Sequence, residues 1–204
     1  MFLVGLTGNF GMGKSTVLPM FEKLGAFTLD TDDIVRSLLT EEEVLKKIRE
    51  ILGGKVFNPD GSLSKEKVSN VIFNNAVLRR SLEDLLHPLV FERINSFLEK
   101  TDKKNRIVIV EIPLLFERGY GNRFDRKITV YTTEETASKR LEAKGIDRQE
   151  SLLRLKSQLP IQEKIKRSDF AIDNDGSIED TSAQVEKIYN RLLEEVEDAD
   201  NKRA

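Results

Sequence analysis

The sequence has no cysteine and no tryptophan, and it contains a single histidine. Without cysteine the chain has neither a disulfide framework nor a cysteine-ligated metal cluster. This absence removes the small disulfide-stapled scaffolds and the cysteine-based zinc modules from consideration. With 204 residues the chain is long enough to bury a core of its own, and we expect one domain.

No charge of one sign dominates, because 33 basic residues face 35 acidic ones and the formal net charge is −2. Such a chain has no overall field that attracts a polyanion, so we expect no nucleic-acid partner. No apolar run approaches the length of a membrane span, and Met1 leads into an apolar segment without a basic leader. We therefore expect a cytoplasmic protein with no membrane partner.

A glycine-rich motif follows a short apolar run at residues 2–6 and fits the phosphate-binding pattern G-x-x-x-x-G-K-[ST] at every fixed position. The motif and the residue after it are Gly8, Asn9, Phe10, Gly11, Met12, Gly13, Lys14, Ser15 and Thr16. Glycines let backbone N–H groups reach a triphosphate, Lys14 can reach the β- and γ-phosphates, and Ser15 can place its hydroxyl on Mg²⁺. The alternative is a glycine-rich turn that only caps a helix, and the full match favours the phosphate site.

Five short runs have strand character and are separated by helical patterns; they cover residues 2–6, 26–30, 106–112, 127–132 and 169–173. Strands that alternate with helices predict an α/β fold with a five-stranded parallel sheet flanked by helices, the P-loop arrangement. The first helix is expected at 14–24, closed by Gly25, with a kink or early end at Pro19. Apolar residues at helical spacing between 185 and 196 predict a final amphipathic helix.

The spacing between strands is uneven. Residues 31–105 are almost wholly helical in pattern, with turns at 53–54 and 58–61, and a second helical stretch covers 134–167. We expect a single domain whose core comprises about 1–30, 106–133 and 168–204, with the helical insertion at 31–105.

A carboxylate cluster follows the second predicted strand. Asp32 and Arg36 are four residues apart and so share a helical face, close to the carboxyl end of that strand. There a carboxylate can accept a hydroxyl proton and an arginine can hold a phosphate of the acceptor. We interpret Asp32 as functional and the neighbouring Asp33 as a helix N-cap.

Positive charge collects between residues 139 and 167, where nine Lys or Arg stand against four Asp or Glu. A basic segment of this kind suits a transferred phosphate. For most of these cations, Lys144 and Lys156 among them, a solvated helix face is the better explanation.

His87 is the only histidine and precedes Pro88, which predicts the end of a helix at Leu86. We favour a packing or capping role for His87 over contact with a substrate, and both alternatives stay open.

The apolar residues 113–116, with Leu114 among them, form either a wall beside the acceptor or buried core. Glu111 and Glu117 flank this run, and the sequence leaves open whether either orders Mg²⁺ through water.

Together these motifs resemble the dephospho-CoA kinase family along nearly the full length of the chain. The resemblance lies in residues 5–8 with the phosphate motif, 29–32 with Arg36, 86–90, 112–117, 140–141 and 169–176. It implies transfer of the γ-phosphate of ATP to the ribose 3′-hydroxyl of dephospho-CoA, the last step of coenzyme A synthesis. It also implies that 31–105 binds the substrate, that 134–167 forms a mobile lid and that the enzyme uses Mg²⁺. We expect a monomer.

Position by position, the resemblance gives Asp32 the role of general base and Arg36 that of a substrate-contacting arginine. Arg140 corresponds to a lid arginine that closes on the phosphates, and Asn174 with Gly176 to a loop beside adenine. His87 and Leu114 are the remaining candidates for substrate contact.

The chain departs from the family pattern where Asn9 replaces a glycine, Met12 replaces a small residue and Lys144 replaces a frequent arginine. The last departure leaves open whether Arg140 or Arg148 closes on the phosphates.

Three rival functions share single features with this pattern. A nucleoside monophosphate kinase would have the same motif and a basic lid, and only the acceptor separates it. A GTPase would need a guanine-reading N-K-x-D segment, yet the only Asn-Lys pair is at 201–202. An RNA-binding module would need aromatic residues among the cations of 139–167, and there are none.

Overall fold

The computed structural model describes residues 1–73, 75–101 and 107–201, and the side chains of residues 148–150, 153 and 200 are outside that description. The chain divides into two compact units. The first comprises Met1–Asp30 and Asp102–Ala204, and the second comprises Thr31–Thr101. The second unit is thus inserted into the chain between two strands of the first.

The first unit is built on a sheet of five strands, all parallel, in the order β2-β3-β1-β4-β5. The strands are β1 (Phe2–Thr7), β2 (Phe27–Asp30), β3 (Ile107–Glu111), β4 (Arg126–Tyr131) and β5 (Phe170–Asp173). The α/β fold class and the five parallel strands are confirmed. Residue 106, where we expected the third strand to begin, lies outside the described residues.

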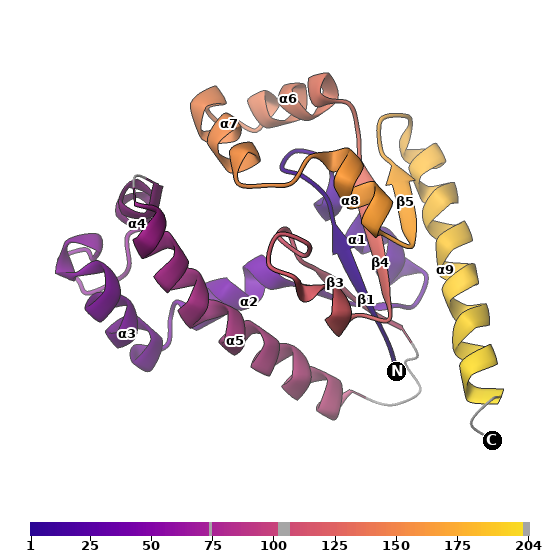
Figure 1. Cartoon of the computed structure of the whole chain (residues 1–204), viewed down its shortest axis with the longest axis horizontal. Coiled ribbons are helices and arrows are strands. Elements are labelled where there is room, and N and C mark those ends of the chain that lie inside the picture. The colour runs from indigo at the N-terminus through magenta and orange to yellow at the C-terminus, as the bar shows by residue number, and fades with distance from the viewer. Residues whose placement is uncertain (74, 102–106, 202–204) are drawn as a thin grey trace. The chain divides into compact units, whose positions relative to one another are not determined.

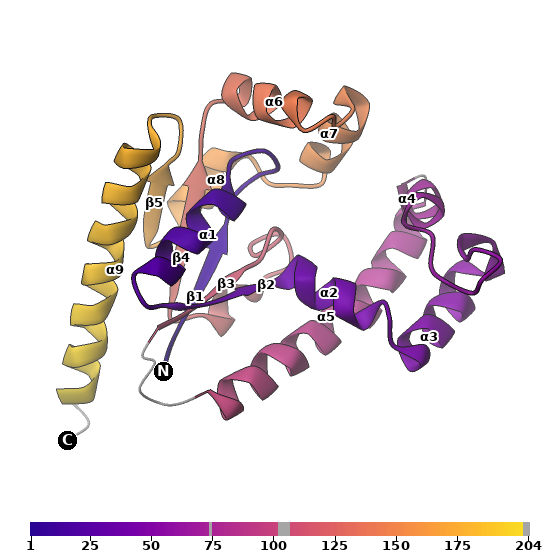
Figure 2. The same ribbon diagram turned by 180° about the vertical axis from the view of Figure 1, so that it is seen from behind.

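Helices cover both faces of this sheet, as the apolar central strands require. α1 (Lys14–Lys23) and α9 (Ile178–Asn201) pack against one face, and α8 (Ile161–Arg167) lies on the other, beside β4 (Figures 1 and 2). All five residues of β3 are buried. A strand buried on both faces needs a continuous apolar run rather than alternation, and residues 107–110 supply one.

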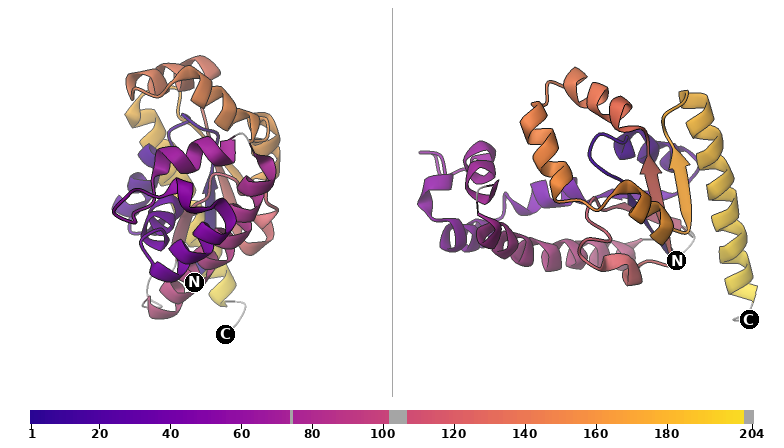
Figure 3. Two further views of the ribbon diagram at one scale, coloured as in Figure 1. Left: turned by 90° about the vertical axis from the view of Figure 1, so that its left-hand side faces the viewer. Right: turned by 45° about the horizontal axis from the view of Figure 1, so that its top comes forward.

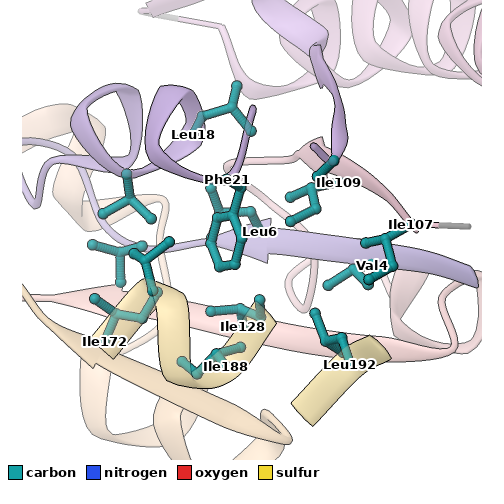
Figure 4. Packing of buried hydrophobic residues seen from close by; sticks show 14 of the residues in the cluster. Val4, Leu6, Leu18, Phe21, Ile107, Ile109, Ile128, Ile172, Ile188 and Leu192 are labelled. Atoms are coloured by element: carbon teal, nitrogen blue, oxygen red, sulfur yellow. The ribbon is translucent and has the colours of Figure 1, made fainter. Parts of the chain in front are cut away.

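The core under α1 and α9 explains the apolar spacing of both helices. Phe21 of α1 is fully buried between the sheet and α9, where it meets Ile188 and Leu192 (Figure 4). Val4 and Leu6 of β1 point into the same cluster, at alternate positions of the strand. This packing fixes α1 on the sheet and with it the loop that leads from β1 into α1.

Pro19 does not end the first helix early, because α1 continues to Lys23 and Gly25 follows with a φ of +105°. Proline removes only one helical hydrogen bond, and the exposed ring of Pro19 faces away from the sheet contacts made by Phe21 and Val17. Packing of the buried face outweighs that local loss. Of the two effects predicted for Pro19, a kink or an early end, the early end is therefore wrong.

Among its described residues, the second unit is wholly helical in its regular structure apart from one isolated bridge between Phe57 and Leu63. Its elements are α2 (Thr31–Leu38), α3 (Glu42–Leu52), the short 3-10 helix η1 (Gly54–Val56), α4 (Lys65–Phe73) and α5 (Ala76–Lys100). The long α5 contacts α2, α3 and α4, and Figure 3 shows the shorter helices gathered along it. The buried residues of the second unit include Ile48 and Leu52 of α3 and Leu82 of α5, which form a core separate from that of the sheet.

The predicted helix end at Leu86 was wrong, since α5 continues through His87 and Pro88 to Lys100. Buried residues recur every four positions along this helix, at Leu82, Leu86, Val90 and Ile94. Pro88 is exposed on the opposite side and removes a single backbone donor. The continuous buried stripe holds the helix together across the proline.

No helix in the described part of the chain is long and apolar enough to cross a membrane.

Candidate active site

The glycine-rich loop joins the carboxyl end of β1 to the first residue of α1. Gly8 and Gly13 are among the positions of this loop where a side chain would not fit. Gly8 has a φ of +153°, and a Cβ there would lie 2.3 Å from the carbonyl oxygen of Val130. Gly13 has a φ of +89°, and its Cβ would lie 1.9 Å from Nδ2 of Asn174. The loop therefore presses against β4 and against the loop after β5, and its backbone is exposed to a ligand only because these side chains are missing.

Lys14 and Ser15 are the first two residues of α1, so the positive end of the helix dipole lies at the phosphate loop. The side chain of Lys14 is buried among loop and sheet, with Nζ 3.5 Å from the carbonyl oxygen of Asn9 and 3.9 Å from Oε1 of Glu111. Glu111 is the last residue of β3 and is itself buried. Ser15 and Thr16 are exposed, with their hydroxyls on the first turn.

Asn174 supports this loop from behind. Its side chain is 2% exposed, its Nδ2 donates to the carbonyl oxygen of Met12 at 3.0 Å, and its Oδ1 accepts from Oγ1 of Thr181 at 3.2 Å. The backbone N–H of Asn174 donates to the carbonyl of Tyr131 at 2.8 Å. The amide thus fixes the phosphate loop to the end of β5, and this role was not predicted.

Arg140 reaches the same place from α6 (Glu134–Ala143). Its Nη2 donates to the carbonyl oxygen of Asn174 at 2.8 Å. Its Nη1 lies 3.4 Å from the position that a Cβ on Gly13 would occupy, and it is buried without a hydrogen-bond partner among the described residues. A buried cationic donor left unsatisfied beside a phosphate-type loop is suited to an anion that occupies the loop.

The amino end of α6 is attached to the loop that follows β5. Asp175 Oδ1 accepts from the hydroxyl of Thr132, from the N–H of Thr133 at 3.2 Å and from the Thr133 hydroxyl at 3.0 Å. Hydrogen bonds from Thr132, then Thr136, then Thr133 hold the pKa of Asp175 well below its ordinary value of 3.8. The helix that carries Arg140 is thereby anchored at its first turn.

This anchor predicts a pH-dependent contribution to stability. The pKa of Asp175 is lower in the folded than in the unfolded chain, so its carboxylate stabilises the fold fully above pH 3.8, and this effect is lost progressively as the pH falls from 3.8 through the lower pKa of the folded chain. We expect Asp175→Asn to lower the melting temperature at pH 7 and to differ less from the parent protein at pH 3. Thermal unfolding of both proteins at the two pH values measures this.

Glu179→Gln is the control, because Glu179 is an exposed carboxylate in the first turn of α9, near Asp175 in sequence. Its difference from the parent protein should be small at both pH values. A difference for Asp175→Asn that stays constant between pH 7 and pH 3 would contradict the assignment.

The segment that returns from α7 (Arg148–Lys156) to α8 is attached to the tip of the phosphate loop. Phe10 N–H donates to Oε1 of Gln158 at 2.9 Å, and Asn9 Nδ2 donates to the carbonyl oxygen of Leu159 at 3.1 Å. The guanidinium of Arg154 lies over the ring of Phe10, 4.6 Å from its centroid. α6 and α7 are therefore held at both ends, and in Figure 1 they lie beyond the carboxyl ends of the strands.

Asp32, Asp33 and Arg36 belong to α2 in the second unit. α2 begins at Thr31, directly after the last residue of β2, and Asp32 is exposed in its first turn. Asp33 is the third residue of the helix and forms an exposed ion pair with Arg36. The interpretation of Asp33 as an N-cap was wrong, because the helix begins two residues earlier.

The other candidates differ in their exposure. His87 is partly buried in the middle of α5; burial lowers its pKa below 6.5, and Asp84 opposes that shift. Leu114 is partly exposed, whereas the adjacent Leu115 is fully buried and belongs to the core. Gly176 is exposed in the loop after β5, and the side chain of Arg148 lies outside the described residues.

Known proteins share this combination of phosphate loop, helical insertion and basic segment, and they identify its family. The family model described as dephospho-CoA kinase matches residues 2–180. The dephospho-CoA kinase of Aquifex aeolicus is 35% identical over 190 residues, which cover 93% of this chain and 96% of the relative.

The chain belongs to the dephospho-CoA kinase family.

Two solved structures are similar to this chain along nearly its whole length. A protein from Thermus thermophilus is 30% identical with a TM-score of 0.81, covering 95% of this chain and 97% of its own. The dephospho-CoA kinase from Campylobacter jejuni is 26% identical with a TM-score of 0.61, covering 93% and 96%. The resemblance in the sequence is confirmed, and the chain is a P-loop kinase of coenzyme A biosynthesis.

The short distance between the Asn174 side chain and the position of a Cβ on Gly13 allows a test of how the phosphate loop is held in this member of the dephospho-CoA kinase family. Gly13→Ala places a methyl group against Nδ2 of Asn174 at a φ that L-residues avoid, so the loop must open. We expect ATP affinity to fall at least about a hundredfold, because the backbone N–H groups no longer converge on the phosphates. Titration with a fluorescent ATP analogue measures it.

Gly61→Ala is the matched control, since Gly61 has a φ of +85° and nothing within 4 Å of a Cβ. It carries the same backbone strain, about 1–2 kcal/mol, without the clash. ATP affinity of this control should equal that of the parent protein. If Gly13→Ala binds ATP no worse than Gly61→Ala does, the clash with Asn174 does not control the loop.

The sequence did not single out three residues that the structure places around the loop, namely Gln158, Leu159 and Lys164. Gln158 and Leu159 act through contacts with Asn9 and Phe10 that are about 150 residues away along the chain, and no local pattern predicts such contacts. Lys164 carried a weak signal: it follows the apolar Ile161 by three positions, on the inward face of α8. The sequence predicts a solvated helix face for most cations of this stretch; Lys144 and Lys156 are exposed, whereas Lys164 is buried.

Proposed function

We propose that the protein transfers the γ-phosphoryl group of ATP to the 3′-hydroxyl of dephospho-CoA, giving coenzyme A and ADP. The observation that carries the proposal is the convergence of two cations on one loop. Lys14 opens α1 from inside the loop, and Arg140 presents its unsatisfied Nη1 beside Gly13 from α6. Transfer of a phosphoryl group depends mainly on positioning and on stabilising negative charge, and this arrangement supplies both.

On the donor side, the backbone of residues 8–13 and the start of α1 cradle the phosphates. Lys14 neutralises the β- and γ-phosphates, and Arg140 neutralises the charge that spreads over the oxygens of the γ-phosphoryl group. Arg140 does this with its free nitrogen while the other stays on the carbonyl of Asn174. Gly176, with the backbone of Asn174, borders the adenine in this proposal, since the Asn174 side chain is occupied by the loop itself.

The residues beside the loop fit Mg²⁺. Ser15 offers an exposed hydroxyl, and Glu111 offers a buried carboxylate next to Lys14. Magnesium commonly takes only one or two protein oxygens and completes its shell with water and phosphate, so this small oxygen set suffices. When bound there, Mg²⁺ would supply positive charge that offsets the charge of the phosphates. Glu117 is a second candidate: its Oε1 is held by Lys164 and by the N–H of Leu159, and its Oε2 is buried without a hydrogen-bond partner among the described residues.

On the acceptor side, we assign Asp32 as the general base that takes the proton from the 3′-hydroxyl. Arg36 holds a phosphate of dephospho-CoA, and it exchanges its exposed ion pair with Asp33 for that contact at little cost. His87 and Leu114 are further contacts for the substrate. Donor loop and base belong to one chain, so the proposal needs no second subunit and we expect a monomer of 23.3 kDa.

The test is to incubate the protein with Mg²⁺ and ATP together with dephospho-CoA, with a nucleoside monophosphate or without acceptor, and to follow ADP. We expect rapid release of ADP with dephospho-CoA alone and coenzyme A as the second product. Equal release without an acceptor, or faster release with a nucleoside monophosphate, would overturn the proposed substrate.

A further inference from the structure

Lys164 is a fully buried lysine in α8, with none of its side chain exposed. Its ammonium group makes two contacts, to Oε1 of Glu117 at 2.9 Å and to the carbonyl oxygen of Pro113 at 2.9 Å. A buried ion pair adds little stability over an apolar pair of similar volume, because both ions lose their hydration. The presence of this pair next to the site is therefore not explained by stability alone.

Both acceptors of Lys164 connect to the start of the phosphate loop. The carbonyl oxygen of Pro113 also accepts from Oγ1 of Thr7 at 3.3 Å, and Thr7 is the last residue before Gly8. Oε1 of Glu117 also accepts from the N–H of Leu159 at 2.8 Å. Leu159 in turn accepts from the Asn9 side chain through its carbonyl oxygen.

Lys164 contacts the loop at 112–118 after β3, and through Glu117 and Pro113 of that loop it is linked to the return segment at 158–160 and to Thr7 before the phosphate loop. Its ammonium is also close enough to that of Lys14 to interact with it. Burial lowers the pKa of Lys164, Glu117 opposes this, and the charge of Lys14 adds to the lowering. All of these residues belong to the first unit.

The return segment at 158–160 is one of several attachments of α6 and α7 to the rest of the first unit. Others are the cluster around Asp175 at the start of α6 and the hydrogen bond from Arg140 to the carbonyl oxygen of Asn174. The placement of α6 and α7 over the phosphate loop therefore depends in part on where the return segment at 158–160 is held. Placing charge correctly at a phosphoryl group requires sub-ångström positioning, and a shift of about 1 Å lowers rates by about a hundredfold.

We propose that Lys164 is a positioning residue of the kinase. Together with Glu117 and the carbonyl of Pro113 it fixes the return at 158–160 against the phosphate loop. Lys14 and Arg140 are thereby held in one geometry relative to the γ-phosphate. Lys164 itself touches no substrate. The effect on the rate rests on the function proposed above, whereas the effect on the loop and the return does not.

The central variant is Lys164→Met with Glu117→Gln. Methionine fills the volume of lysine, and glutamine keeps an oxygen for the N–H of Leu159, so no unpaired charge is left inside. We expect a melting temperature within a few degrees of the parent protein. We also expect kcat at saturating ATP and dephospho-CoA to fall at least tenfold, with less than a threefold change in the Kd for ATP.

Hydrogen exchange without nucleotide measures positioning directly and needs no acceptor. Backbone amides of residues 9–13 and 157–161 should exchange faster in the double variant, and those of α9 should be unchanged. Lys166→Met is the control, because Lys166 is on the same helix but 71% exposed, in a surface ion pair with Glu163. It should leave kcat and exchange as they are.

A double variant whose kcat stays within twofold of the parent would overturn the proposal, since the pair would then be structural only. A tenfold fall in kcat with unchanged exchange at both segments would overturn it too, because Lys164 would then act directly. If the double variant does not fold, Lys164→Arg decides by the same two readouts, because it keeps a charge opposite Glu117 but changes its geometry. A parent protein that binds ATP but ignores dephospho-CoA would refute the proposed substrate while leaving the exchange result interpretable.

Discussion

Replacing Asp32 with asparagine should lower kcat by about 10²–10⁴-fold and leave the affinity for ATP nearly unchanged. Asparagine keeps the size and polarity of the side chain but cannot take the proton from the attacking hydroxyl. Asp32 is exposed in the first turn of α2, so the substitution should not disturb the core of the second unit. Steady-state rates with dephospho-CoA and titration with an ATP analogue measure the two effects separately.

Asp33→Asn is the matched control, in the same turn of the same helix. Its ion pair with Arg36 is exposed, with 62% and 60% of the two side chains accessible, and such pairs contribute little. We expect less than a threefold change in kcat. Retention of most of the parent rate by Asp32→Asn at saturating substrate would show that another group is the base.

The second large effect is expected at Arg140, where Arg140→Lys should lower kcat by about 10²–10³-fold. Arg140 uses Nη2 on the carbonyl of Asn174 and leaves Nη1 beside Gly13 for the ligand. Lysine is a single point charge and cannot serve both positions at once. The charge is conserved, so a large loss isolates the geometry of the guanidinium. Single-turnover rates at saturating ATP measure it.

Lys139→Ala is the control for the neighbouring cation. Lys139 is on the same helix, 71% exposed, and it pairs with Glu135 one turn away. We expect no measurable change in kcat. If Arg140→Lys keeps the parent rate, or if Lys139→Ala loses as much, the charge of the segment matters rather than the placement of Arg140.

The sequence alone predicted the α/β class, the five parallel strands and the family, because each is encoded in contiguous residues. A buried parallel strand such as β3 requires an apolar run, and the loop from Gly8 to Ser15 requires small residues at fixed spacing. Local patterns failed where packing outweighs propensity. Pro88 predicted a helix end, but the buried stripe of α5 continues across it.

Some functional residues can be identified from sequence motifs alone, whereas others can be identified only from the folded structure. The phosphate motif identifies Lys14 and Ser15 from the sequence alone. The order of the motifs indicates Asp32, Arg36 and Arg140 as further candidates, and the experiments on Asp32 and Arg140 test two of them. Composition could not separate Lys164 from Lys144 or Lys156, since all three lie in one basic stretch. Burial separates them, and burial is a property of the folded chain.

What the sequence determined by itself is thus the phosphate loop, the order of the elements and membership of the dephospho-CoA kinase family. What only the tertiary structure decided is how that loop is held. Asn174 binds Met12 from 162 residues away, and Lys164 joins Glu117 and Pro113 to the return of the chain at Leu159. These contacts form only after the parallel strands have brought distant loops to one edge of the sheet, so no local pattern encodes them.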